Sequence, residues 1–233
     1  MPQIMRLIPN PRTFVGASLL AVMAVSLACS LSLQYGHADV PIAATAEEIQ
    51  PLASGDRAPR FTLRSVDHEE YVVNPRDLAR PAVIIAIRGG RCPDCNMHLS
   101  ELRHVVGDID SLGVDVLFLS GDRPDQLYAS LGRETQQDIA GLGYTIYSDA
   151  DAQAAVAFGI AFRASQGTID RRLEKGQDIE RSSMQLHGVL PVPSVFAISR
   201  DGNIAFAYSN ADYKVRLPAD ELLQVAKDLA APE

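Results

Sequence analysis

The stretch IIAIRGGRCPDCNMHLSELRHVV, residues 84–106, decides how the rest of the chain is interpreted. It passes from an apolar block, through two glycines, into Cys92-Pro-Asp-Cys95 and then into a helical pattern. The apolar block, Ala82–Ile87, is apolar on both faces, which is typical of a buried central strand. The chain has three cysteines, and two of them lie in this stretch. They could form a redox pair, part of a metal site or a structural disulfide.

The residues after the motif predict a helix that packs on the sheet. Apolar positions recur at spacings of three and four, which marks one helix face; they are Cys95, Leu99, Leu102, Val106 and Ile109. A second apolar block, Val114–Ser120, follows this helix and predicts another buried strand. Strand, crossover helix and strand together predict a βαβ unit with parallel neighbours.

The remaining patterns complete one α/β domain with a central mixed β-sheet flanked by helices. An N-terminal β-hairpin is predicted around Phe61 and Tyr71, and a polar insertion over 161–190. The other predicted elements are helices over 125–139, 150–160 and about 169–181, a strand over 144–149, strands over 194–199 and 203–208 around an Asp-Gly turn, and a closing helix with Pro218 near its start.

Residues 1–38 predict an export signal. They hold two arginines and no acidic residue, then an apolar run over 14–33, then small residues that end at Ala38. This order matches a signal peptide that is cleaved after Ala38. The apolar run is also long enough to remain as a membrane anchor, and Cys29 offers a third possibility, a lipoprotein. Residues 39–54 are predicted as a linker, and 55–231 as the folded domain.

Charge and export limit the classes of function. The whole chain carries a formal net charge of −8, and removal of residues 1–38 removes two basic residues and no acid. A protein this acidic has no basic stripe that could bind nucleic acid, and we therefore expect no nucleic-acid partner. We expect an exported protein of the periplasm or envelope, which touches membrane only through its N-terminal segment. Disulfides form and persist in such compartments.

Cys92 is the predicted nucleophile. It lies where strand gives way to helix, with Pro93 as the first helical residue, so unpaired N–H groups and the helix dipole favour a thiolate there. Arg88 and Arg91 add positive charge nearby, whereas Asp94 opposes ionisation. Cysteines in such places have pKa values well below that of a free thiol.

Cys95 begins the buried helix face, which suits a resolving thiol that attacks a mixed disulfide on Cys92. A structural disulfide between residues three apart would stabilise little. A four-cysteine zinc site lacks its second pair. Copper stays possible if His98 or His187 joins the two thiols, although each histidine also has an ordinary interpretation, as a solvated helix or loop residue.

Four blocks in the right order, GDRAPRFTL, RGGRCPDC, LPVPSVFAISRDGNI and DYKVRLPADELL, give the chain a resemblance to a known family. Over about residues 55–230 it resembles the thioredoxin-like superfamily, specifically the peroxiredoxin-like proteins of the alkyl hydroperoxide reductase/thiol-specific antioxidant group. The resemblance implies a thioredoxin-like fold. It also implies a cis Val192–Pro193 bond opposite the cysteine pair, with the backbone of Val192 free to bind an extended substrate.

The chain departs from the family at the peroxide site. Family peroxidases resemble one another in a Pro and a Thr or Ser before the peroxide-reactive Cys, and in a distal Arg. Ile85 and Gly89 occupy the first two places here, and Arg163 or Arg216 is the candidate for the third.

These observations leave several functions open. The first is a thiol–disulfide oxidoreductase that uses the Cys92–Cys95 dithiol and needs no cofactor beyond that redox-active disulfide. The second is a thiol-dependent peroxidase, the third a copper-binding chaperone, and the fourth a binding module without catalysis. The expected partners are protein thiols and disulfides or peroxides, with an upstream thiol reductant or oxidant.

Overall fold

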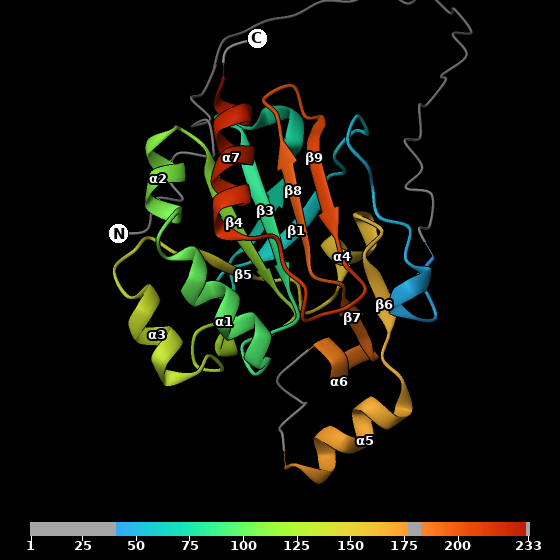
Figure 1. Ribbon diagram of the computed structural model, residues 1–233. Helices are drawn as coiled ribbons and strands as arrows, with labels where there is room; N and C mark the ends of the chain where they lie inside the picture. The colour runs from blue at the N-terminus through green and yellow to red at the C-terminus, as the bar shows by residue number, and fades with distance from the viewer. Residues whose placement is uncertain (1–40, 177–182, 232–233) are drawn as a thin grey trace, which may run out of the picture.

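The computed structural model describes residues 41–176 and 183–231. In Figure 1 a twisted sheet stands at the centre, with helices on both sides. Its seven strands have the order β2-β1-β5-β4-β3-β8-β9, and two further strands, β6 and β7, pair separately. The strands are β1 (Phe61–Arg64), β2 (Glu70–Val73), β3 (Ala82–Ile87), β4 (Asp115–Ser120), β5 (Ile146–Ser148), β6 (Ala161–Arg163), β7 (Val189–Pro191), β8 (Ser194–Ile198) and β9 (Ile204–Ser209).

Seven α-helices and three short 3-10 helices are described over the same residues. The α-helices are α1 (Pro93–Leu102), α2 (Val106–Ser111), α3 (Arg133–Ile139), α4 (Gln153–Ala157), α5 (Gln166–Glu174), α6 (Ser183–His187) and α7 (Ala219–Ala230). The 3-10 helices are η2 (Ala46–Glu48), η3 (Pro75–Asp77) and η4 (Pro124–Gln126).

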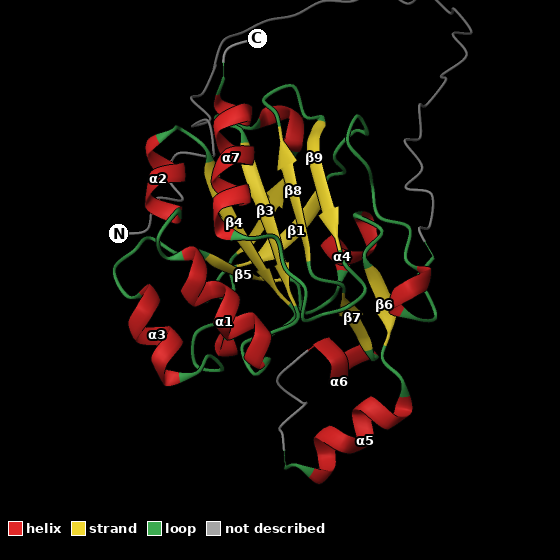
Figure 2. Cartoon of the chain, viewed as in Figure 1, coloured by secondary structure: helices red, strands yellow, loops and turns green. Residues whose placement is uncertain are grey.

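The predicted βαβ unit and the mixed sheet are confirmed. β3 runs parallel to β4, and β4 runs parallel to β5, whereas β8 pairs antiparallel with β3. The two hairpins, β1–β2 and β8–β9, also form as expected. Figure 2 shows the yellow sheet as one layer between red helices.

The two faces of the sheet carry separate apolar cores. Side chains alternate along β3, so Val83, Ile85 and Ile87 belong to one core, whereas Ile84 and Ala86 belong to the other. The first core is completed by residues of α1, α2, α3 and α7, and it includes both cysteines of the motif. The second is completed by α4, and the ring of Phe158 packs edge-on against Phe61 and tilted against Phe196. A third, smaller cluster lies under α5 and α6.

Several predicted helices differ in extent. The helix expected over 125–139 is wrong in its first half: η4 is followed by turns, and α3 begins only after Gly132, whose extended backbone donates its N–H to Asn96. The stretch after the cysteines is two helices, α1 and α2, and all of its predicted core positions are buried. α4 occupies only the middle of the predicted 150–160 helix.

The predicted linker is attached to the domain where it is described. Ala43 pairs with β6, and the N–H of Leu52 donates to the Phe158 carbonyl. Residues 1–40, with the predicted export signal and Cys29, lie outside the described residues, as does the end of the helix predicted to reach 181. In the described residues, no helix combines the length and apolar character that crossing a bilayer requires.

The carboxyl ends of the three parallel strands meet at one edge of the sheet, where α/β proteins place their functional residues. The loop after β3 carries Arg88 and Cys92, the loop after β4 carries Asp122, and Asp149 follows β5. The cysteine motif is therefore brought next to residues from distant parts of the chain.

Candidate active site

Cys92 forms the start of α1. It is the N-cap residue with extended backbone (φ −84°, ψ 117°), and Pro93 is the first helical residue, as predicted. Its carbonyl accepts from the N–H groups of Cys95 and Asn96, both at 3.1 Å. Cys92 is 5% exposed and Cys95 is fully buried, so of the two sulfurs only Cys92 borders solvent.

The two cysteines are free thiols that share a hydrogen bond. Burial disfavours a thiolate on Cys95, but the hydrogen bond from Cys92 and the charge of Arg216 outweigh it and lower the pKa of Cys95 to about 6. The hydrogen bond to Cys95, burial and the neighbouring charge raise the pKa of Cys92. The thiolate was expected on Cys92, but the cation that contacts the pair, Arg216, lies against the inner sulfur and favours the thiolate on Cys95. The reduced pair holds one negative charge at neutral pH.

Arg216 supplies the cation next to the inner sulfur. Its Nη2 lies 3.4 Å from the Sγ of Cys95, and its Nε donates to the Tyr213 carbonyl at 2.9 Å. Its Nη1 is buried and has no hydrogen-bond partner. Arg163, the other candidate, is exposed on β6. The structure thus brings Arg216, and not Arg163, to the thiol pair.

Arg88 contacts the loop that carries Arg216. Its guanidinium is placed over two rings, 4.8 Å from the centre of Tyr213 and 5.6 Å from that of Phe162. Burial lowers the pKa of Arg88, and the charges of Cys92 and Cys95 oppose that change. Arg88 is therefore part of the charge balance of the site, as predicted.

The other charged residues predicted to tune the thiols, Arg91 and Asp94, are less buried than the two cysteines. Arg91 is exposed, and its charge acts on the buried carboxyl of Asp122. Asp94 is half-buried in the first turn of α1. Effects of Arg91 and Asp94 on the thiols stay predictions.

Asp122 fixes the loop that leads into Cys92. Its carboxylate accepts from the Gly90 N–H at 2.6 Å and from the Ser130 hydroxyl at 2.8 Å. Burial raises the pKa of Asp122, and these hydrogen bonds oppose the rise. Gly89 has a φ of +143°, and a Cβ there would lie 2.8 Å from Oδ1 of Asp122. The absence of a side chain at Gly89 therefore makes room for this acid.

Asn96 holds the same loop from the helix side. Its Nδ2 donates to the carbonyls of Gly90 and Cys92, and its Oδ1 accepts from the Gly132 N–H at 2.7 Å. A single amide thus joins the loop after β3, the start of α1 and the start of α3.

The expected cis Val192–Pro193 bond is wrong, because every peptide bond in the described part of the chain is trans. The N–H of Val192 donates to the Ile160 carbonyl at 2.9 Å, and its carbonyl accepts from the Ser194 hydroxyl at 3.0 Å. Val192 is 1% exposed. Its backbone is thus already paired and is not free to add a substrate strand.

The two histidines considered as metal ligands have other partners. His98 is buried, not solvated as its ordinary interpretation held, and its Nε2 lies 3.1 Å from the Leu217 carbonyl. The Nε2 of His187 lies 2.7 Å from the Ala150 carbonyl. Across residues 41–176 and 183–231, no three His, Cys, Asp or Glu side chains gather in a way that could hold a metal ion. The copper interpretation therefore lacks a third ligand in those residues.

Comparison with known proteins agrees with this geometry. The family model described as "AhpC/TSA family" matches residues 54–207. The chain belongs to the AhpC/TSA family. Peroxiredoxin Bcp of Escherichia coli is 32% identical over 113 residues, which cover 48% of this chain and 67% of that protein. Membership makes the chain an oxidoreductase that works through thiols.

Solved structures of this family share the fold. A peroxiredoxin-like protein from Aquifex aeolicus aligns with a TM-score of 0.55 at 20% identity, covering 77% of this chain and 89% of its own. Peroxidoxin BcpB from Mycobacterium tuberculosis aligns with a TM-score of 0.51 at 17% identity, covering 76% and 98%. At these identities the likeness concerns the fold alone.

Sequence analysis did not identify several residues of the candidate site. Asp122 and Asn96 drew no functional prediction, His98 was considered only as a possible copper ligand, and Arg216 was only one of two candidates. A signal existed for Asp122, since an acid directly after a buried parallel strand lies at the functional edge of the sheet. No local signal identifies His98, because its partner is 119 residues away.

Proposed function

We propose that the chain is a thiol-dependent peroxidase in which Cys92 reacts with the peroxide and Cys95 resolves the product. One observation carries the proposal: a singly charged dithiol at the start of α1, with Arg216 against its inner sulfur and with Cys92 as the more exposed of the two cysteines. The peroxiredoxin relatives support this function over the simple disulfide oxidoreductase that the motif alone favours.

In the first step, the proton shared by the two sulfurs moves to Cys95 and leaves the thiolate on Cys92. This thiolate attacks the outer oxygen of the peroxide, so an S–O bond forms and the O–O bond breaks. Sulfur gives two electrons to oxygen, and Cys92 becomes a sulfenic acid. The leaving hydroxide or alkoxide takes a proton from solvent and departs as water or an alcohol.

In the second step, Cys95 releases to solvent the proton that it took up, and the resulting thiolate attacks the sulfur of the sulfenic acid. The S–S bond forms, hydroxide leaves, and a proton from solvent converts it to water. The resulting Cys92–Cys95 disulfide is the redox-active group that we propose, with no other cofactor. A thiol reductant then returns two electrons and two protons to complete the cycle.

Stopped-flow measurement of hydrogen peroxide and of an organic hydroperoxide tests this function. We expect the reduced full-length chain to consume one equivalent of either much faster than free cysteine does, and Cys92→Ser to lose that reaction. A wild-type rate no greater than that of free cysteine would refute the proposal.

A thiol–disulfide oxidoreductase is the second candidate, and one observation favours it. Gly89 replaces the hydroxyl residue of family peroxidases, and the carboxylate of Asp122 occupies the adjacent space. Reduction of insulin by the dithiol, compared with Cys92→Ser under the same reductant, distinguishes the two functions. Fast insulin reduction without peroxide consumption would favour this candidate.

We also propose that the protein acts outside the cytosol. The N-terminal export pattern, which ends at Ala38, supports this location. Cell fractionation with mass analysis of the mature N-terminus tests it. A mature chain that begins at residue 39 supports cleavage, lipid on Cys29 supports the lipoprotein, and an intact chain in the cytosol contradicts export.

A further inference from the structure

His98 is a buried histidine that the chemistry of the two thiols does not use. It lies on α1, three residues after Cys95, so both side chains are on the same helix face. Its side chain is 4% exposed. Because a carbonyl oxygen only accepts, the contact of 3.1 Å with the Leu217 carbonyl means that Nε2 carries the proton and donates it. The opposite ring nitrogen, Nδ1, is buried without a partner.

Burial, with a further effect from the charge of Arg216, lowers the pKa of His98 to about 4, although the hydrogen bond opposes this change. The imidazole is therefore neutral at physiological pH and keeps its single N–H on the Leu217 side. A neutral ring next to a cation adds no repulsion. His98 is suited to holding a backbone group and is not suited to carrying charge.

The carbonyl that His98 holds belongs to the residue after Arg216. The preceding part of the loop, Asp212–Val215, is exposed, whereas Leu217 is 2% exposed in the core that includes both cysteines. Arg216 itself bonds within this loop only to the Tyr213 carbonyl, three residues earlier. The bond from His98 therefore ties the backbone at the Arg216 end of the loop to the helix that carries Cys95, next to the side-chain contact of Arg216 with that cysteine.

We propose that His98 is a positioning residue for the active site: it anchors the Leu217 carbonyl so that the Arg216 guanidinium stays against Cys95. The contacts form a closed ring, from Cys95 along one turn of α1 to His98, across to Leu217, and back through Arg216 to the sulfur. The catalytic consequence rests on the proposed peroxidase function. The effect on thiol ionisation does not, and it can be measured without peroxide.

The experiment compares His98→Met, which keeps volume but removes the donor, with His98→Gln, whose amide nitrogen reaches the place of Nε2. Thiol ionisation is followed in the full-length chain by ultraviolet absorbance of the thiolate and by the pH profile of alkylation. We expect His98→Met to lose about fivefold in alkylation rate near pH 6, which corresponds to a rise of about one pKa unit from about 6. His98→Gln should recover most of that loss.

His187→Met is the matched control. His187 makes the same kind of bond, from Nε2 to a backbone carbonyl, but to Ala150 near the end of β5. His187→Met should lower the free energy of unfolding without changing the ionisation of the thiols. Arg216→Met and the double variant with His98→Met complete the set, and the double variant should be no worse than Arg216→Met alone, because both changes remove one interaction.

The proposal is overturned if His98→Met ionises like the wild type while Arg216→Met does not, or if His187→Met shows the same loss. It is also overturned if neither His98→Met nor Arg216→Met changes the titration. Should His98→Met fail to fold, His98→Asn, whose shorter amide does not reach Leu217, carries the same expectation. Absence of peroxide consumption by the wild type would instead count against the peroxidase function alone.

Discussion

The Nη2 of Arg216 lies 3.4 Å from the Sγ of Cys95, although 121 residues separate them in the chain. A cation this close to a buried sulfur stabilises the thiolate strongly, because little water screens the pair. Together with the hydrogen bond from Cys92, it lowers the pKa of the inner cysteine of the motif.

Replacing Arg216 by Met should therefore raise the first pKa of the dithiol. The wild-type pair should ionise at a pH of about 6, and removal of an adjacent opposite charge shifts a pKa by about 1–3 units. Peroxide consumption in the wild type should rise with pH through that ionisation and then level off, and the variant should need a higher pH. Arg163→Met, at an exposed arginine on β6, is the control that should leave the profile unchanged.

The Cys95→Ser variant and the wild type should differ in the oxidised product that forms on reaction with peroxide. Cys95→Ser is expected to consume one equivalent of peroxide and to keep a sulfenic acid on Cys92, because no resolving thiol remains. Dimedone labelling followed by mass spectrometry detects that acid, and the wild type should show a disulfide instead. Peroxide-dependent labelling of Cys95 in Cys92→Ser, at the wild-type rate, would show that the roles are reversed.

The glycine before the motif should tolerate no side chain. A Cβ on Gly90 would lie 2.8 Å from the backbone nitrogen of Leu131, closer than packed atoms allow. Gly90→Ala should lower the free energy of unfolding by about 1–3 kcal/mol, the usual cost of overpacking. Gly107 in α2 is the matched control, since a Cβ there meets nothing within 4 Å, and Gly107→Ala should stabilise the helix by up to about 1 kcal/mol.

Urea unfolding followed by circular dichroism measures both glycine variants, because the chain has no tryptophan to report by fluorescence. Gly90→Ala should also slow alkylation of Cys92, because the displaced residue lies two positions before Cys92 in the same loop. Equal stability of the two variants would contradict the close approach of Leu131 to the loop.

Local patterns were sufficient for the parts of the site that one stretch of chain determines. The block Ala82–Ile87 is β3, Cys92 is the N-cap of α1, and Cys95 begins the buried face, because each follows from residue spacing within one element. The ionisation of the pair could not be predicted in this way. It depends on Arg216, which reaches Cys95 only after the chain has folded.

The prediction about Val192 failed for a similar reason. Its backbone was expected to be free, but it pairs with Ile160, a residue outside the blocks that carry the family resemblance. Likewise, the helix predicted over 125–139 had a plausible pattern, but α3 begins only after Gly132, whose N–H donates to Oδ1 of Asn96. Long-range hydrogen bonds determined both outcomes.

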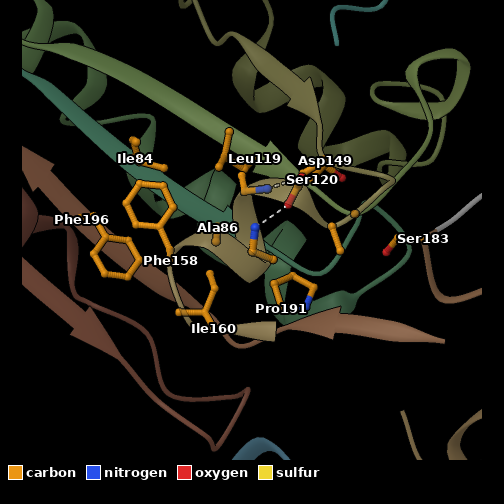
Figure 3. A pocket seen from close by; sticks show the side chains of 14 residues that line it. Ile84, Ala86, Leu119, Ser120, Asp149, Phe158, Ile160, Ser183, Pro191 and Phe196 are labelled. Carbon is orange, nitrogen blue, oxygen red and sulfur yellow. Dashed lines mark hydrogen bonds between the residues drawn. The ribbon is translucent and has the colours of Figure 1, made fainter. Parts of the chain in front are cut away.

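The pH dependence of stability should reflect Asp149, which follows β5 on the face of the sheet opposite the cysteines. Its carboxylate accepts from the N–H groups of Ala154 and Ala155 and borders an apolar cavity lined by Ala86 and Phe158 (Figure 3). Burial raises its pKa to about 7, although the two N–H donors oppose this rise.

Because the folded pKa is above the unfolded value of 3.8, the stability that this group contributes is complete below pH 3.8 and is lost as pH rises towards 7. Asp149→Asn should remove that loss, since an amide does not ionise and still offers an acceptor to the α4 N–H groups. The free energy of unfolding of the variant minus that of the wild type should thus rise by about 2–4 kcal/mol between pH 4 and 8. Urea titrations at several pH values measure the difference, and a difference that is constant with pH would mean that the carboxyl ionises in the folded protein as it does in the unfolded chain.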